Sequence, residues 1–161
     1  MELDFAFLAD AAVVDATGKL SVLGVFDRIR APEFPARHGR IALVMRLAAR
    51  SEDEGKHKVE IRLRGADGQD ILRLDGEVRV GPGASTGEHT RIAQVLNLDG
   101  VVFPRPGAYR FEIRINDELA APVPLLLEGV EGRSAGRGGP LGSTGPEGVP
   151  IVFARGGPAE A

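Results

Sequence analysis

The chain has 161 residues, of which 43% are hydrophobic, and its 20 basic and 23 acidic residues give a formal net charge of −3. This length fits one domain with a sizeable core, and the charge supplies no positive field that would attract nucleic acid or an anionic membrane. Because there is no cysteine, a disulfide framework and thiolate chemistry are excluded. The first residues lack a basic secretory region and no apolar run has membrane-spanning length, so we expect a cytoplasmic protein.

The first stretch of the chain predicts a β-hairpin. Residues 3–14 form an apolar run, and residues 19–29 form the return strand. Between them Gly18 can adopt the left-handed conformation that a three-residue loop needs. If Asp15 faces Lys19, the numbers of facing residues add up to 34 all along the hairpin.

Both faces of this hairpin are apolar. A two-layer sandwich buries only one face of each sheet, so the other face needs a cover. That cover is a partner subunit, the chain's own tail or a ligand. The residues that we expect at this second, interfacial face are Phe5, Phe7, Ala9, Val13, Leu23, Val25 and Ile29.

Asp10 interrupts the apolar run of the first strand. A buried carboxylate must be paired, hydrogen-bonded or protonated. The register above places Asp10 within two residues of Arg28 on the same face, which predicts a structural ion pair between Asp10 and Arg28. A slip of one residue would instead align Asp10 with Asp27. A calcium site that uses Asp10, Asp27 or loop carboxylates is the alternative, although no Asp-x-Asp spacing supports it; those loop carboxylates are Asp67, Asp70 and Asp99.

The next part of the chain predicts a meander of strands. Residues 41–47 are apolar almost throughout, and residues 57–64 alternate cleanly between apolar and charged side chains before 71–80 continue the pattern. Residues 91–98 fit both helical and strand spacing, but their short length and the turn that follows favour a strand. About eight strands with frequent turns indicate an all-β, two-layer antiparallel sandwich.

The stretch from Phe103 to Asp117 carries the most informative pattern. It begins with a Pro-Gly corner, after which apolar and charged residues alternate. A tyrosine directly after such a corner is typical of the tyrosine corner of immunoglobulin-like sandwiches, so we expect Gly107 and Tyr109 to form one. Pro122 and Pro124 in the following run suit an edge strand, because proline cannot donate a ladder hydrogen bond.

The composition changes after Val130. Residues 131–161 contain nine glycines and four prolines, and so little apolar surface cannot offset ~1–2 kcal/mol of backbone ordering entropy per residue. We therefore expect a β-sandwich domain at 1–130 and a flexible Gly/Pro-rich tail at 131–161. The apolar segment 150–154 is the exception, and its composition suits strand addition to an exposed edge or to the hairpin face; its central residues are Ile151, Val152 and Phe153.

No constellation of residues predicts catalysis. The three histidines are scattered singly, and there is no nucleophile elbow and no P-loop. Glu60 and Glu112 lie in the same rows as four arginines, so we expect ion pairs across strands in preference to a basic stripe; these arginines are Arg62, Arg64, Arg110 and Arg114. We therefore expect no enzyme activity, no cofactor and no metal.

Several of these motifs resemble those of a known family. The motifs are Phe7-Leu-Ala-Asp10-Ala, Gly18-Lys-Leu, Gly24-Val-Phe-Asp-Arg28-Ile and Pro106-Gly-Ala-Tyr-Arg-Phe111. They are similar to a family of small bacterial β-sandwich proteins that is known only as a domain of unknown function. The resemblance covers residues 4–128 and leaves the tail out. It implies the fold, and it implies no activity, cofactor or catalytic residue.

The sequence thus predicts a non-enzymatic protein-binding or assembly module that acts through the apolar outer face of its N-terminal hairpin. The partner is either a second copy of the chain, in a homo-oligomer, or another protein. The alternative is a sandwich that binds calcium or a small ligand through loops 82–90 and 99–106. An enzyme with dispersed catalytic residues is a further alternative.

Overall fold

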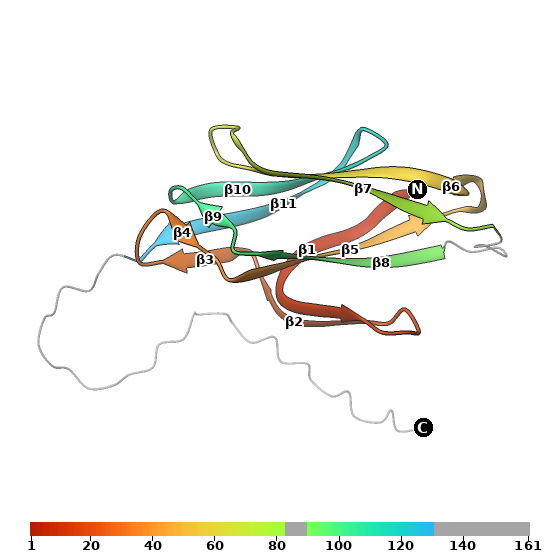
Figure 1. The fold of residues 1–161 in the computed structure, drawn as a ribbon, viewed down its shortest axis with the longest axis horizontal. Helices are drawn as coiled ribbons and strands as arrows, with labels where there is room; N and C mark the ends of the chain where they lie inside the picture. Colours follow the sequence, from red (N-terminus) through yellow and green to blue (C-terminus); the bar gives the residue numbers. More distant parts are fainter. Residues whose placement is uncertain (83–89, 131–161) are drawn as a thin grey trace, which may run out of the picture.

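The computed structural model describes residues 1–82 and 90–130, and most of these residues lie in β-strands (Figure 1). The described ranges contain no helix with the length and apolar composition needed to cross a membrane. In chain order the elements are β1 (Glu2–Val14), β2 (Leu20–Phe26), β3 (Arg28–Ala31), β4 (Ala36–Arg37), β5 (Arg40–Ala49), the 3-10 helix η1 (Ser51–Asp53), β6 (Gly55–Arg64), β7 (Asp70–Val80), β8 (Thr90–Asp99), β9 (Val102–Phe103), β10 (Gly107–Ile115) and β11 (Glu118–Gly129).

Two sheets stack face to face. The first sheet has the strand order β2-β1-β5-β8, the second has the order β3-β11-β10-β6-β7, and β4 pairs separately with β9. Figure 1 shows the two sheets as layers seen from their edges, with β2 and the end of β1 that leads into it below them. The predicted all-β, two-layer sandwich is confirmed. Among the described strands one pair, β3 with β11, is parallel, which the prediction of a purely antiparallel fold did not include.

The described ranges contain more strands than the eight or so predicted because one predicted strand is divided. The return strand of the hairpin was expected to cover 19–29, but β2 ends at Phe26 and the chain crosses at Asp27 to the second sheet, where it continues as β3. The two-residue strands β4 and β9 account for the rest. Residues 91–98 belong to strand β8, as their short length indicated.

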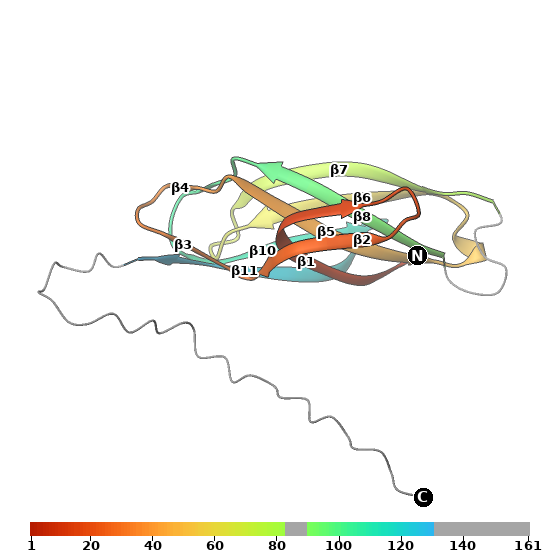
Figure 2. The ribbon, with the colours of Figure 1, turned by 90° about the horizontal axis from the view of Figure 1, so that it is seen from below.

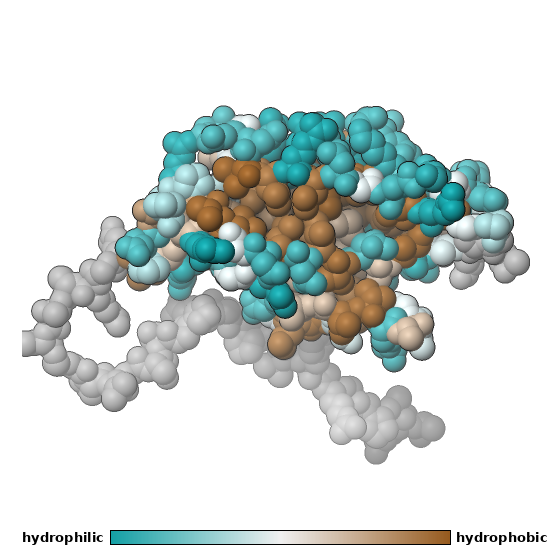
Figure 3. Space-filling model, viewed as in Figure 1, coloured by the Kyte–Doolittle hydropathy of each residue, from teal (hydrophilic) through white to brown (hydrophobic). Residues whose placement is uncertain are grey.

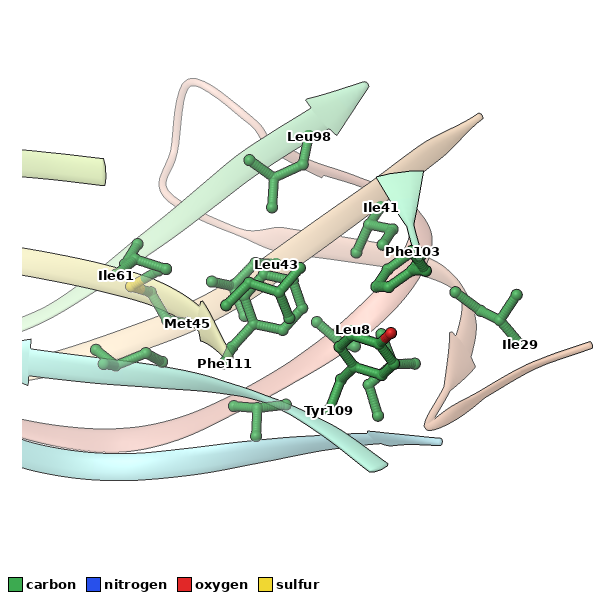
Figure 4. Close-up of a cluster of buried hydrophobic side chains, with 14 of the residues drawn as sticks. Leu8, Ile29, Ile41, Leu43, Met45, Ile61, Leu98, Phe103, Tyr109 and Phe111 are labelled. Atoms are coloured by element: carbon green, nitrogen blue, oxygen red, sulfur yellow. The ribbon is translucent and has the colours of Figure 1, made fainter. Parts of the chain in front are cut away.

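The main hydrophobic core fills the space between the sheets. Successive side chains of a strand point to opposite faces, so each strand sends its alternate apolar residues inward. Leu43 of the first sheet and Phe111 of the second are fully buried. In Figure 4 both lie in one cluster with Leu8 and Tyr109, between strands of opposite sheets. Burial of this apolar surface is the main source of the stability of the sandwich.

Some of the sequence predictions fall outside the described residues. The tail at 131–161, with its apolar segment 150–154, lies there. So do residues 83–89 of one of the two loops proposed for ligand binding.

Candidate functional site

The N-terminal hairpin has the predicted register. The N–H of Asp15 donates to the carbonyl oxygen of Lys19 at 2.9 Å, and Gly18 has a left-handed φ of 83°. Facing residues run from Leu8 opposite Phe26 to Val14 opposite Leu20, so their numbers add up to 34. The hydroxyl of Thr17 and the backbone N–H groups of Lys19 and Thr17 donate to the Asp15 carboxylate and lower its pKa.

The hairpin bends at one position, where Asp10 stands opposite Gly24. The ladder between β1 and β2 skips this pair, and Gly24 has a φ of 66°, a conformation that favours glycine. A Cβ atom at Gly24 would clash with Oδ2 of Asp10. The register is the same on both sides of this pair, so no residue is inserted, and the left-handed conformation of Gly24 interrupts the extended backbone of β2. The distal half of the hairpin therefore leaves the plane of the first sheet.

The distal half of the hairpin folds back over the outer face of the first sheet. Ala12 and Leu20 pack against a small cluster around the fully buried Ala9, Ala42 and Val44. Figure 2 shows the hairpin lying in front of β5 in the view from below. The face that the sequence analysis left without a cover is therefore covered in part by the hairpin itself.

This folding changes which of the predicted interface residues face solvent. Ala9 is fully buried, and Phe5 and Phe7 are half-buried, with their rings stacked at 5.5 Å between centroids. The guanidinium of Arg46 lies over the Phe5 ring, 4.6 Å from its centroid. Phe5, Phe7 and Ala9, which were predicted to lie at an interfacial face, are thus covered at least in part by the chain itself, and Ala9 is not accessible to a partner.

The residues that do face solvent lie on the opposite side of the folded hairpin. Val13, Leu23 and Val25 have exposed fractions of 60%, 71% and 64%, and Ala11 opposite Leu23 is also exposed. We call these four residues the hairpin face. In Figure 3 brown, hydrophobic atoms lie over the hairpin at the lower border, whereas the upper border over the second sheet is teal.

Two further predictions are corrected by the crossing at Asp27. Ile29 belongs to β3 in the second sheet and is buried in the main core, so it cannot contribute to an outer face of the hairpin. Arg28 moves with it and pairs with Glu128 at 3.2 Å, in place of the predicted ion pair with Asp10. Asp10 is exposed and lies against the backbone of Gly24.

The tyrosine corner holds the start of β10. The hydroxyl of Tyr109 donates to the carbonyl oxygen of Arg105 at 2.8 Å. The Tyr109 ring is buried and meets Phe103 edge to face, with 5.1 Å between centroids. Gly107 has a φ of 142°, which suits glycine at this corner. The corner is thus a structural element.

The outer face of the second sheet is charged and largely paired. Strand β6 lies between β7 and β10. The outward-pointing arginines of these neighbouring strands therefore lie beside Glu60 of β6 and Glu112 of β10. Arg62 and Arg73 each form an ion pair with Glu60, both at 2.7 Å. The hydrogen bond from Arg62 lowers the pKa of Glu60. Arg110 forms an ion pair with Glu112 at 2.8 Å, and the hydrogen bond from Arg110 lowers the pKa of Glu112. The predicted ion pairs across strands are present, and they neutralise this face locally.

The predicted calcium ligands do not converge. The described residues contain no group of three or more histidine, aspartate or glutamate side chains that could hold a metal ion. Asp67 pairs with Arg105, Asp70 pairs with Arg64 at 2.8 Å, and Asp99 pairs with Arg40 at 2.7 Å. Hydrogen bonding from Arg40 lowers the pKa of Asp99. These carboxylates are therefore used separately in ion pairs.

The structure also contains a groove that the sequence analysis missed. It has a volume of about 380 Å³ and lies beside the end of β2, between β1 and β11. Its position depends on the order of strands in two sheets, and no local pattern encodes that order. The sequence contains one local sign of the groove. It is Asp27, the polar residue at which the chain leaves β2 in the first sheet and crosses to the second sheet. The lining residues are Ala6, Phe7, Leu8, Val25, Phe26, Asp27, Val123 and Pro124.

Comparison with known proteins gives a match to one family model. The model of a family of unknown function (DUF6941) matches residues 4–128. No curated protein matches the sequence. Among solved structures, the chain is similar to an immunoglobulin-like protein from Pseudomonas aeruginosa, with 13% identity and a TM-score of 0.42. The match covers 79% of this chain and 95% of that one.

Proposed function

The chain belongs to a family of unknown function, and from that premise we propose that it is a non-enzymatic, cytoplasmic assembly module. It associates with a second copy of itself through the hairpin face, that is, through Ala11, Val13, Leu23 and Val25. The single observation that carries the proposal is the exposure of these apolar side chains. A chain without cysteine suits the reducing cytoplasm.

The exposed apolar residues are concentrated on the hairpin. Seven large hydrophobic residues are exposed within the described ranges, and four of them belong to β1 and β2. These four are Val13, Val22, Leu23 and Val25; the other three are Val102, Leu119 and Val130. Isolated apolar residues on a surface need no explanation, but a contiguous group marks a site of interaction. The hairpin face is such a group.

The hairpin is also chemically self-complementary. Strand β2 carries no charged residue, so two copies can meet there without burying an unpaired charge. By contrast, the outer face of the second sheet carries dense ion pairs, whose burial would cost desolvation energy. Identical patches that meet across a two-fold axis form the commonest kind of oligomer interface.

The expected association is weak. Three side chains of this exposure offer roughly 100 Å² each, so two copies bury roughly 600 Å² and gain about 15 kcal/mol before costs. The loss of translational and rotational freedom costs about 4–15 kcal/mol. We therefore expect a dimer that dissociates on dilution.

Sedimentation velocity over a concentration series tests the proposal. The natural chain should shift from monomer to dimer between about 1 μM and about 1 mM, and Leu23→Lys should remain a monomer throughout. Leu119→Lys is the matched control, because Leu119 is 52% exposed but lies on β11 in the other sheet. It should associate like the natural chain.

Two results would overturn the proposal. One is a natural chain that stays monomeric over the whole series. The other is a loss of association in Leu119→Lys equal to that in Leu23→Lys, because the hairpin face would then have no special part in the contact.

A further inference from the structure

The outer face of the second sheet keeps an excess of positive charge after its ion pairs are counted. On the neighbouring strands β7, β6 and β10, eight basic and five acidic residues point outward, which gives this face a formal charge of +3. These outward positions are the even-numbered residues of 56–64 in β6 and of 110–114 in β10, with Asp70 and the odd-numbered residues of 73–79 in β7. The remaining 12 basic and 18 acidic residues of the chain have a formal charge of −6. The positive face therefore differs in sign from the rest of the chain.

Basic residues of this face stand directly opposite one another. Three such pairs form between β6 and its two neighbours, against one pair of acidic residues. The basic pairs are Arg64 with Arg110, Arg62 with Arg73, and Lys56 with Arg79. Like charges in directly opposed positions repel each other and destabilise a sheet. An anion bound at the surface would relieve this repulsion.

The arginines also lie above the glutamates that pair with them. Glu60 and Glu112 are buried, whereas Arg73 and Arg110 are half-exposed. A guanidinium group has five N–H donors, and Arg110 contacts Glu112 through Nε. Above the two buried glutamates, the outermost groups are therefore guanidinium groups with further donors directed to solvent.

We propose that this face binds an acidic, extended segment of another protein. Carboxylate groups form paired, charge-assisted hydrogen bonds with guanidinium groups. The carboxylates of the partner contact Arg73, Arg79 and Arg110 from the solvent side. The ion pairs with Glu60 and Glu112 then stay in place, and no buried charge loses its partner. Arg79 forms no ion pair within the described ranges, so binding at Arg79 breaks no such contact.

The charge distribution favours a short acidic segment over nucleic acid. Residues 56–64 of β6 span roughly 26 Å, which is the length of about eight extended residues. A longer polyanion would extend past this face to the acidic remainder of the chain, which repels it. Base stacking also lacks a platform, because none of the outward residues of β6, β7 and β10 is aromatic. In Figure 1 the face lies on the far side of the molecule from the hairpin, so this inference does not rest on self-association.

Fluorescence anisotropy of a labelled peptide of about ten glutamates, long enough to cover the face, tests the proposal. At about 20 mM salt the full chain should bind this peptide with a Kd on the order of 10 μM, and at about 300 mM salt the affinity should fall at least about tenfold. Arg110→Gln and Arg79→Gln should each weaken binding about fivefold, because each removes one exposed charge contact. Arg79→Gln also leaves every ion pair within the described ranges intact, so a loss of affinity in this variant cannot come from a broken ion pair.

Arg91→Gln is the matched control, because Arg91 is also exposed but lies on β8 in the first sheet. It should change the Kd by less than about twofold. The proposal would be overturned by a peptide that shows no saturable binding at low salt. An equal loss of affinity in Arg91→Gln and in the two variants of the face would also overturn it, as would tighter binding of a single-stranded oligothymidine of the same charge.

Discussion

Gly24 determines the direction of the N-terminal hairpin. Its φ of 66° and its contact with the Asp10 side chain lie at the single skipped pair between β1 and β2. Everything distal to this pair folds over the first sheet, and this distal part carries Ala11, Val13 and Leu23 of the hairpin face. The register of the hairpin was predictable, since two strands of alternating residues fix it through their turn. The bend was not predicted, although an isolated glycine inside a strand can mark a tight bend.

Gly24→Ala should destabilise the protein at this position. A side chain in the left-handed region costs about 1–2 kcal/mol, and the new Cβ also displaces the Asp10 carboxylate. Urea denaturation measures the free energy of unfolding. Gly39→Ala is the control, because Gly39 has no contact within 4 Å of a built Cβ and no positive φ, and its change should stay within about 0.5 kcal/mol. Equal effects of the two substitutions would contradict the role given to Gly24.

At the scale of elements, the strands themselves could be predicted and their partners could not. The alternating residues of β6 and β10 indicated their inward apolar rows, which are buried as expected. On the outward rows, Glu60 and Glu112 are buried beneath the arginines that pair with them. The Pro-Gly corner before Tyr109 likewise predicted a structural corner, because its chemistry is local. The crossing from β2 to β3 could not be predicted in this way. It depends on the parallel pairing with β11, about 100 residues later in the sequence.

The tyrosine corner offers a test at this scale. Tyr109→Phe removes the hydrogen bond to the Arg105 carbonyl but keeps the ring, and it should lower the free energy of unfolding by about 0.5–1.5 kcal/mol. Arg105→Ala keeps the accepting carbonyl and removes only an exposed ion pair with Asp67, so it should cost less than about 1 kcal/mol. Urea denaturation followed by far-UV circular dichroism measures both. A neutral Tyr109→Phe would show that the hydroxyl does not hold the corner.

The outer surfaces of the two sheets differ in their chemistry. The second sheet carries the ion pairs around Glu60 and Glu112, and the hairpin over the first sheet carries exposed apolar residues. The pattern of charges along each strand predicted the ion pairs. It could not predict the groove between β1 and β11, because the walls of the groove come from both sheets.

The ion pairs predict how stability depends on pH. The pKa of Glu60 and that of Glu112 lie below their usual value, so the folded chain binds fewer protons than the unfolded chain in the acidic range. Their contribution to stability is complete above the unfolded-state pKa of about 4.3 and is lost as the pH falls through the folded-state pKa.

Urea denaturation between about pH 7 and about pH 2.5 checks this dependence. Glu60→Gln and Glu112→Gln should each reduce the acid-linked uptake of protons on unfolding by up to about one proton. Their curves of stability against pH should therefore be shallower than that of the natural chain. Glu33→Gln is the control, because Glu33 is exposed and forms no ion pair with the described residues. Parallel curves for all four proteins would contradict the assignment.

The hairpin lies below the first sheet in Figure 1, and the arginine-rich outer surface of the second sheet lies at the top, on the far side of the molecule. Two copies joined through their hairpins would therefore point their arginine-rich surfaces in opposite directions. Such a pair would cover the apolar hairpins at its centre and present the ion-paired surfaces of the second sheets to solvent at both ends.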